Sequence, residues 1–391
     1  MTNEQIHNYR SFPICDTHVH LVYQESLEKT IQIYRDIMNH FNYERIVLLA
    51  MHNSMKGSDP ANNAKVLYCK SIMNAEMTGR KIYGFGSLFH YFDGRDTAEG
   101  YLRQIMLMDK LGFDGIKMLE GKPQLRKKLA RRLDDPIFDG MYEYAEKHRL
   151  PIKMHLGDPA SFWKSSEKSG TAQTRANGYD ESYPTLEQLR DEIDGILQKF
   201  PDLHLHLAHF YFMGHELERA ATFFNTWKNV AFDLTPGGEM FVGFTRRPEE
   251  WRAFFKTYAD RIYYGTDTYN MFYSEVPEDY ENGYGVGYRN NQCRMMLEKN
   301  DAFEDQYFGR LMPLHLDDEI LRKIYHDNCA GLLGEPRVVS NELAMAYAAF
   351  VLEKFEHKTV CTELEARDEE EIVHLRKIYD YYTEKCKEGE R

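Results

Sequence analysis

The sequence lacks the features that would tie the chain to a membrane or to a nucleic acid. It has no run of 18 consecutive apolar residues, and its first stretch, MTNEQIHNYRSFPICD, has neither the basic start nor the apolar run of a signal peptide. Positive charge is not in excess, because 62 Asp and Glu residues outnumber 49 Lys and Arg residues and give a net charge of −13. We therefore expect no membrane span and no nucleic-acid or anionic-membrane partner.

Cysteine is scarce and carries no pattern. The six cysteines in 391 residues form neither a CxxC pair nor a dense framework. They lie at positions 15, 69, 293, 329, 361 and 386. In a chain of this size such scattered cysteines are typical of free thiols in a reducing compartment. We predict a cytoplasmic protein without disulfides.

Eight strand-like runs alternate with amphipathic helical stretches. No glycine-rich turn follows the first run, which argues against an open, doubly wound sheet that binds a dinucleotide. Eight alternating units are the number that closes a (β/α)8 TIM barrel, and we predict that fold. The expected strands are 14–20, 45–53, 81–90, 112–119, 150–157, 203–210, 229–236 and 261–268.

The predicted barrel spans residues 1–335, and residues 336–391 form a C-terminal helical extension. Two stretches after the expected strands, 157–184 and 269–293, are too long and polar for simple connectors and would lie on the face that carries an active site. The extension packs on the barrel or on a partner, because one face of its last helix is apolar and must be buried. The chain could therefore self-associate. The apolar face consists of Ile372, Leu375, Ile378, Tyr379 and Tyr382.

The ends of the expected strands carry most of the residues capable of chemistry. The first strand, ICDTHVH, places three polar side chains on one face, because side chains alternate along a strand. If the barrel closes, all strand ends converge at its carboxyl-terminal mouth. Imidazoles together with a carboxylate are the usual ligands of zinc and similar ions. The strand-end residues are Asp16, His18, His20, His52, His90, Lys117, His155, His209 and Asp267.

Five segments in this order resemble the signatures of the amidohydrolase superfamily. They are DTHVHL (16–21), KMHLG (153–157), LAHF (207–210), YGTDT (264–268) and YHDNCAGLLG (325–334). The sequence is most similar to the branch that contains aminocarboxymuconate-semialdehyde decarboxylase. The resemblance covers about residues 12–335 and leaves out the long loops and the C-terminal tail.

The resemblance implies a site with one divalent metal ion, zinc first and manganese as the alternative. It assigns His18, His20, His155 and Asp267 as ligands, Asp267 also as general base, and His209 as the group that polarises the substrate. Asp16 would be a supporting residue. A second metal is implied only if the lysine that ends the fourth strand is carboxylated; that residue, Lys117, could instead bind an anionic substrate or be structural.

Four further residues are candidates for contact with a small-molecule substrate: Lys117, His52, His90 and Arg175. Each histidine could instead anchor a loop, and Arg175 could be a surface arginine. A second HxH pair, His204 and His206, is expected to face the helix layer.

The main prediction is a metal-dependent hydrolase in which a metal-activated water attacks a small amide, ester or lactone. The alternative is a metal-dependent, non-oxidative decarboxylase of a small unsaturated or aromatic acid, which an arginine beside the metal would favour. A barrel that binds a ligand without catalysis is the third hypothesis, but every expected ligand position holds a residue able to bind metal.

Overall fold

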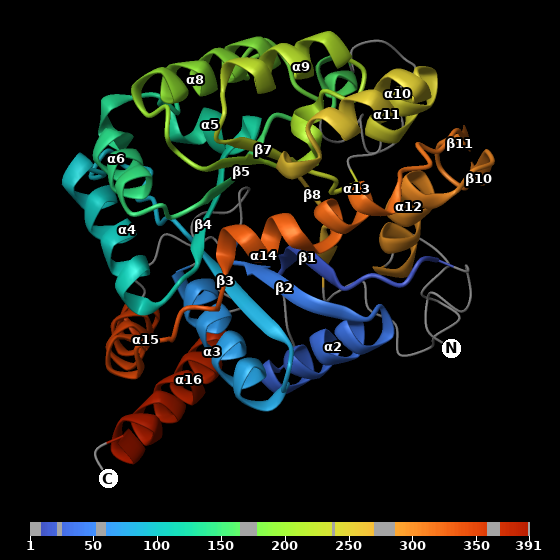
Figure 1. Ribbon diagram of the computed structural model, residues 1–391. Helices are drawn as coiled ribbons and strands as arrows, with labels where there is room; N and C mark the ends of the chain where they lie inside the picture. The colour runs from blue at the N-terminus through green and yellow to red at the C-terminus, as the bar shows by residue number, and fades with distance from the viewer. Residues whose placement is uncertain are drawn as a thin grey trace.

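The computed structural model describes residues 9–21, 26–51, 60–164, 178–236, 239–269, 286–357 and 368–389. A parallel sheet forms the centre, and helices surround it (Figure 1). The strands are β1 (Ile14–His20), β2 (Tyr43–Leu49), β3 (Lys81–Ser87), β4 (Gly115–Gly121), β5 (Ile152–Leu156), β6 (Leu205–Leu207), β7 (Val230–Asp233), β8 (Ile262–Tyr263) and β9 (Thr268–Tyr269).

Helices separate most of the strands along the chain and continue after the last strand of the central sheet. They are α2 (Leu27–His40), α3 (Pro60–Glu76), α4 (Ala98–Leu111), α5 (Pro123–Leu129), α6 (Asp139–Lys147), α8 (Leu186–Lys199), α9 (Leu217–Thr226), α10 (Glu239–Arg246), α11 (Pro248–Thr257), α12 (Val286–Glu298), α13 (Asp318–Arg322), α14 (Asn328–Leu333), α15 (Asn341–Glu356) and α16 (Asp368–Gly389). A short antiparallel pair, β10 (Phe303–Asp305) and β11 (Gly309–Leu311), lies beside them.

The sheet curls into a barrel whose eighth strand is in two pieces. Its order is β8-β7-β6-β5-β4-β3-β2-β1-β9, and β8 pairs with β7 while β9 pairs with β1. Residues 264–267 separate β8 from β9, and Thr17 donates its backbone N–H to the carbonyl oxygen of Tyr264 at 3.1 Å. The sequence-based prediction of a (β/α)8 barrel is therefore confirmed, with an interruption that the run 261–268 did not reveal.

Local sequence explains where the surrounding helices begin and end. Thr185 and Gln188 form a capping box at the start of α8, and Thr97 caps α4. α4 ends at Gly112, whose φ of 95° suits a residue without a side chain. The strands are buried along almost their whole length, as parallel barrel strands are, and their apolar residues form the core with the inner faces of the helices.

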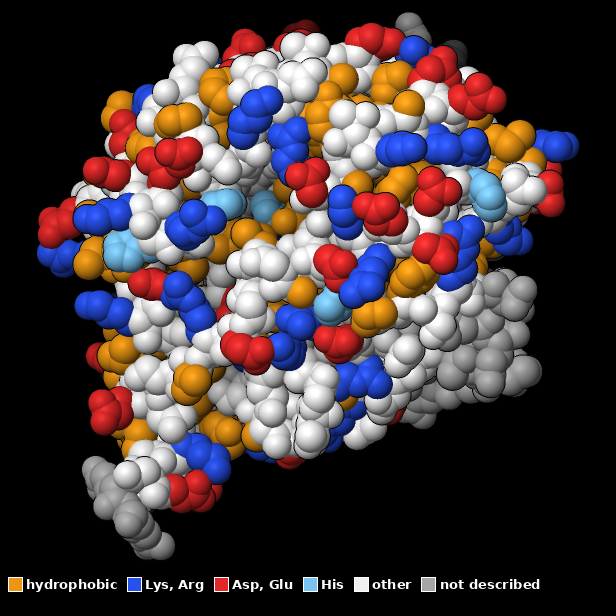
Figure 2. All heavy atoms as spheres, viewed as in Figure 1, with side chains coloured by type: hydrophobic (Ala, Val, Ile, Leu, Met, Phe, Trp, Pro, Cys, Tyr) orange, Lys and Arg blue, Asp and Glu red, His pale blue; other side chains and the backbone are white. Residues whose placement is uncertain are grey.

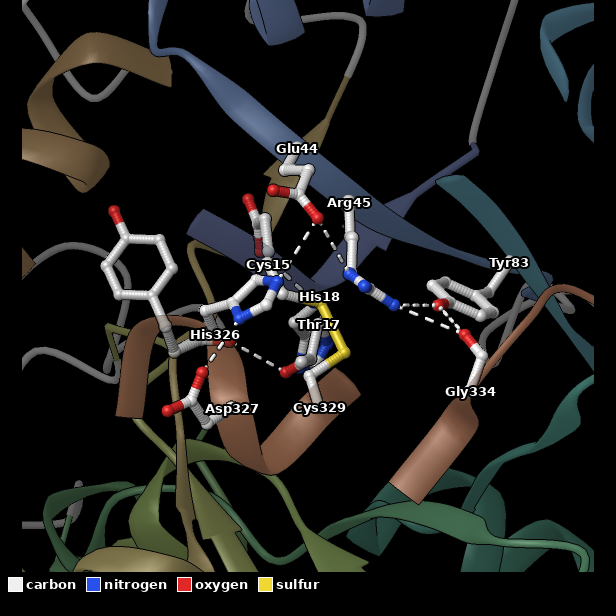
Figure 3. The surroundings of a disulfide bond; sticks show 12 residues. Cys15, Thr17, His18, Glu44, Arg45, Tyr83, His326, Asp327, Cys329 and Gly334 are labelled. Atoms are coloured by element: carbon white, nitrogen blue, oxygen red, sulfur yellow. Dashed lines mark hydrogen bonds and ion pairs between the residues drawn. A yellow bond between two sulfur atoms is a disulfide. The ribbon is translucent and has the colours of Figure 1, made fainter. Parts of the chain in front are cut away.

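One end of the barrel is closed by α14, which lies across the sheet in Figure 1. Leu332 and Leu333 of α14 line a small cavity in the barrel interior together with strand residues such as Val47 and Phe85. Cys15 of β1 and Cys329 of α14 form a disulfide there (Figure 3). The expectation of free thiols throughout is therefore wrong for this pair, because the fold brings together two cysteines that lie 314 positions apart.

The C-terminal helices α15 and α16 pack on each other and on α3. Lys65 of α3 pairs with Glu371 at 2.5 Å, and the Ser71 and Tyr382 hydroxyls lie 3.1 Å apart. Leu375 and Ile378 are also buried, whereas Tyr379 remains 36% exposed. Most of the apolar face of α16 is therefore covered by this chain itself. The division at residue 335 and the self-association of the chain remain predictions.

Among the described helices, none has the length and the apolar composition needed to cross a bilayer. Figure 2 shows one face of the molecule, where basic and acidic side chains are interspersed rather than gathered by sign.

Candidate metal centre

Two histidines of β1 point their Nε2 atoms at each other. His18 and His20 are buried, and these two nitrogens lie 3.0 Å apart. A register shift in the pairing of β1 with β2 between Asp16 and Val19 marks an irregularity in the strand at this point. Two basic nitrogens at this distance need a proton or a cation between them.

Asp267 completes a group of three donor residues. It lies between β8 and β9 with a φ of 56°, in the left-handed region. Its Oδ1 is 3.0 Å from His20 Nε2 and 3.7 Å from His18 Nε2. His18, His20 and Asp267 are the potential metal-binding cluster in the described part of the chain.

The separations within this triad fit a divalent ion. Ligand atoms about 2.0–2.1 Å from a tetrahedral zinc ion are about 3.3 Å from one another, close to the 3.0 and 3.7 Å found here. Burial lowers the pKa of His18 and lowers that of His20 to about 4, so both imidazoles are neutral and able to bind metal at pH 7. Two neutral imidazoles and a carboxylate are a suitable donor set for zinc or manganese.

Asp267 is ionised although it is buried. Burial alone would raise its pKa, but Arg289 and His20 outweigh that effect and hold the pKa well below the usual value. Arg289 lies on α12, is 5% exposed, and places Nη1 2.6 Å from Asp267 Oδ2. The site therefore holds a permanent positive charge beside the carboxylate. In the sequence Arg289 lies in the long stretch 269–293, and its place in the first turn of α12 brings it to the site.

His155 and His209 form a second pair next to the triad. His155 Nδ1 lies 3.2 Å from His209 Nε2, and its Nε2 points to the carbonyl oxygen of Gly157 at 2.9 Å. The rings of His209 and His18 are 5.7 Å apart. The Nδ1 atom of His209 is buried and has no hydrogen-bond partner among the described residues. The structure thus places both residues at the site, with His155 outside the donor triad.

Lys117 reaches the triad from β4. Its Nζ lies 3.3 Å from His18 Nε2, and the side chain is fully buried. Burial, together with the neighbouring Lys153, lowers the pKa of Lys117 to about 7. A neutral amine is thus accessible near physiological pH, as both carboxylation and proton transfer require.

Two acidic residues support the site from behind. Asp16 accepts hydrogen bonds from Thr266 N at 3.1 Å and from Thr266 Oγ1 at 2.5 Å, which ties β1 to the segment that carries Asp267. Burial raises the pKa of Asp16 to about 7 in spite of these bonds. Asp233 ends β7 and contacts His18 Nδ1 at 2.8 Å. Asp233 was not among the strand-end residues predicted from the sequence, although it ends a strand as they do.

The remaining candidates lie elsewhere or cannot be placed. His52 and Arg175 fall outside the described residues. His90 is buried between Tyr101 of α4, at 2.8 Å, and Glu120, at 2.6 Å, and has no described contact with the triad. His206 does not face the helix layer as expected. It lines the cavity inside the barrel with Lys153. Side chains along β6 alternate between the two faces of the sheet, and His206 lies on the inner face.

Comparisons with known proteins bear on the family and the fold of this chain. A family profile described as amidohydrolase matches residues 15–334. The fold is similar to an uncharacterized TIM-barrel protein from Bordetella bronchiseptica, with 16% identity, a TM-score of 0.52, and coverage of 82% of this chain and 98% of that one. It is also similar to 2,6-dihydroxybenzoate decarboxylase from Rhizobium, with 13% identity, a TM-score of 0.51, and coverage of 83% and 99%. No curated protein sequence matches the chain.

Proposed function

Because this chain belongs to the amidohydrolase family, we propose that it is a metal-dependent decarboxylase of a small unsaturated or aromatic carboxylic acid. Membership of the superfamily makes it an enzyme whose relatives use a divalent metal. The finer assignment rests on the residues around the triad. The decarboxylase from Rhizobium, with its similar fold, is consistent with the choice.

The observation that carries the proposal is the position of Arg289. Its guanidinium lies 2.6 Å from Asp267 Oδ2, so it is within reach of any substrate bound at the triad. Arginine recognises carboxylates through two parallel hydrogen bonds and stays charged at all relevant pH values. A decarboxylase must hold the carboxylate of its substrate, whereas a hydrolase acting on a neutral amide, ester or lactone has no substrate carboxylate to hold.

The roles of the side chains follow from their charges. His18, His20 and Asp267 would hold the metal, which would withdraw electrons from the substrate through an oxygen next to the carboxylate. Arg289 orients the carboxylate that leaves as carbon dioxide. Asp267 starts ionised, takes a proton from water or from a substrate hydroxyl, and delivers it to the carbon that has lost carbon dioxide. His209 contributes a ring beside His18 that can donate to the substrate.

Hydrolysis is the second candidate, and Lys117 is the observation in its favour. The amine lies 3.3 Å from His18 Nε2 with a pKa lowered to about 7. Carboxylation of this lysine would create a bridging ligand for a second metal, and a two-metal site activates water. His155 would then become a ligand to one of the two ions.

Release of labelled carbon dioxide tests the proposal. The zinc- or manganese-loaded protein is incubated with hydroxybenzoates and small unsaturated diacids that carry a ¹³C carboxylate, beside a panel of lactones, esters and amides. We expect one carbon dioxide per turnover and no hydrolysis. Hydrolysis of the second panel without carbon dioxide release would favour the second candidate.

Variants of α12 isolate the role of Arg289. Arg289→Met should lower kcat/KM for decarboxylation at least about 100-fold, since a charge-assisted hydrogen bond to the substrate is lost, and Arg289→Lys should recover part of it. Arg294 is the matched control. It is fully buried on the same helix and pairs with Glu298 at 2.7 Å. Arg294→Met should cost stability but leave kcat/KM within a few-fold of wild type.

A further inference from the structure

The Asp233 side chain contacts three separate parts of the site. Its Oδ2 lies 2.8 Å from His18 Nδ1 and 2.8 Å from Lys153 Nζ. Its Oδ1 accepts the backbone N–H of His209 at 2.9 Å and that of Thr235 at 3.2 Å. One carboxylate at the end of β7 thereby joins β1, β5 and the turn that follows β6.

The environment of Asp233 keeps this carboxylate charged and fixed. Asp233 and Lys153 are each 1% exposed, and a buried charge persists only with a partner. Lys153 supplies that partner and also donates to Thr17 Oγ1 at 3.0 Å, so its ammonium is held on two sides. An acceptor anchored in this way cannot turn away from His18.

The contact with Asp233 decides which of the two ring nitrogens of His18 carries the proton. The other nitrogen, which faces the triad, is left unprotonated. An ionised carboxylate only accepts hydrogen bonds, so Nδ1 of His18 must carry the hydrogen that it gives to Asp233. The hydroxyl of Thr235 lies 2.9 Å from the same nitrogen. With Nδ1 protonated, the lone pair of Nε2 points at His20 and Asp267, as metal binding requires.

We propose that Asp233, anchored by Lys153, is a positioning residue that fixes the tautomer and orientation of His18 for metal binding. The inference rests on the metal site of the proposed function but not on its chemistry, since decarboxylation and hydrolysis would need the same His18. Carboxylates that orient a ligating histidine typically change metal affinity 10- to 100-fold when they are replaced.

Asp233→Asn is the informative variant. The amide keeps an oxygen for the backbone N–H of His209, but its nitrogen can donate to His18 Nδ1 and so stabilise the tautomer with the proton on Nε2. Zinc affinity, measured by competition with a chromophoric chelator, should fall 10- to 100-fold. The unfolding midpoint in urea, recorded without metal, reports the structural cost separately.

Asp114→Asn is the matched control, because Asp114 is likewise a buried partner of a buried lysine. Its Oδ2 lies 2.5 Å from Lys70 Nζ and accepts the backbone N–H of Gly84 at 2.8 Å. It precedes β4, at the end of the barrel away from the triad. This variant should lose stability like Asp233→Asn and keep the zinc affinity of the wild type.

Two further measurements keep the inference open to refutation if Asp233→Asn does not fold. The double variant Lys153→Met/Asp233→Asn leaves no unpaired charge and should show the same loss of affinity. In the wild-type protein loaded with zinc, a histidine-selective ¹H–¹⁵N spectrum should show a protonated Nδ1 on His18. Wild-type affinity in a folded variant, or a His18 ring protonated at Nε2, would overturn the inference. A wild-type protein that binds no metal at all would instead refute the proposed function.

Discussion

At the scale of single residues, the two groups assigned to proton transfer and polarisation share an unusual backbone conformation. His209 and Asp267 both have a φ of 56°, and the next three residues after His209 also lie in the left-handed region. Such a conformation costs about 1–2 kcal/mol for a residue with a side chain. Asp233 holds the backbone of His209 in place, and Thr266 is tied to Asp16 next to Asp267. The surrounding hydrogen bonds therefore maintain conformations that the chain would not choose alone, which is typical of functional sites.

Metal content is the first prediction at this scale. The wild-type chain, purified without added metal and then loaded, should hold about one zinc or manganese per chain by elemental analysis. His18→Ala/His20→Ala should hold none, because two of the three triad ligands are gone.

Other stoichiometries would change the assignment. About two metals per chain, both lost when Lys117→Met is introduced, would indicate a bridging lysine and favour hydrolysis. A wild-type chain that takes up neither zinc nor manganese contradicts the metal centre. His148→Gln, at the exposed residue that follows α6, serves as the control for a nonspecific histidine site.

The free energy of unfolding should depend on pH in part through His206. Burial, reinforced by Lys153, lowers the pKa of His206 from 6.5 to about 3. Between these values the unfolded chain binds a proton that the folded chain does not. The contribution of His206 is therefore fully present above pH 6.5 and is lost as the pH falls toward 3.

His206→Leu should make the free energy of unfolding less sensitive to acid. Between pH 6 and 4 the wild type should lose about 1.4 kcal/mol per pH unit more than the variant, the effect of one proton. Urea unfolding at several pH values measures this slope. Equal slopes for His206→Leu and wild type would refute the buried, neutral state.

At the scale of elements, the alternation of strand and helix was predictable from the sequence. The periodicity of apolar residues, and the residues that end helices and strands, are local properties of the chain. The expected strand 14–20 coincides with β1, whereas 261–268 is interrupted between β8 and β9. The interruption arises from the left-handed Asp267 and from the bonds of Asp16 to Thr266. Neither is visible in a pattern of apolar residues, so the position of Asp267 relative to His20 had to come from the structure.

Contacts between distant segments account for the rest of what the sequence did not reveal. Arg289 reaches Asp267 because α12 packs beside β9, and Cys15 meets Cys329 because α14 closes the end of the barrel opposite the triad. His18, His20 and Asp267 could be proposed from the sequence since strand ends of a barrel converge. The orientation of His155 toward Gly157 could not, because it depends on a hydrogen bond in a loop.

Helix ends offer a prediction that belongs to this scale. α5 ends at Ala130 with a φ of 50°, at an exposed position where most helices place glycine. Ala130→Gly should raise the free energy of unfolding by about 0.5–1 kcal/mol, since glycine adopts this conformation without steric cost. Gly112→Ala at the end of α4 is the opposite case, because a Cβ there would collide with the carbonyl oxygen of Val338. Urea unfolding should show that Gly112→Ala lowers the free energy of unfolding by more than Ala130→Gly raises it. A less stable Ala130→Gly variant would contradict this prediction.

At the scale of the whole molecule, the barrel is joined from its first strand to its last helix at the end opposite the metal centre. Arg45 of β2 donates to Tyr83 of β3 at 2.7 Å and to the carbonyl oxygen of Gly334 at 3.2 Å (Figure 3). His326 lies between Glu44 and Asp327 nearby. The Cys15–Cys329 disulfide adds a covalent link to the same junction, so opening this end requires β1 and α14 to part.

The disulfide should stabilise the fold chiefly by restricting the unfolded chain. It closes a loop of nearly the whole barrel, and removing such a crosslink typically costs about 2–4 kcal/mol. Cys15→Ala/Cys329→Ala should therefore unfold at lower urea, and a reductant should lower the wild-type midpoint toward that of the variant while leaving the variant unchanged. Cys69→Ala, which removes a buried free thiol, is the control for the loss of sulfur packing and should keep the wild type's sensitivity to reductant. Because the crosslink lies behind the triad rather than in it, zinc affinity should stay within a few-fold of wild type; a large loss would mean that α14 holds β1 in the register on which His18 and His20 depend.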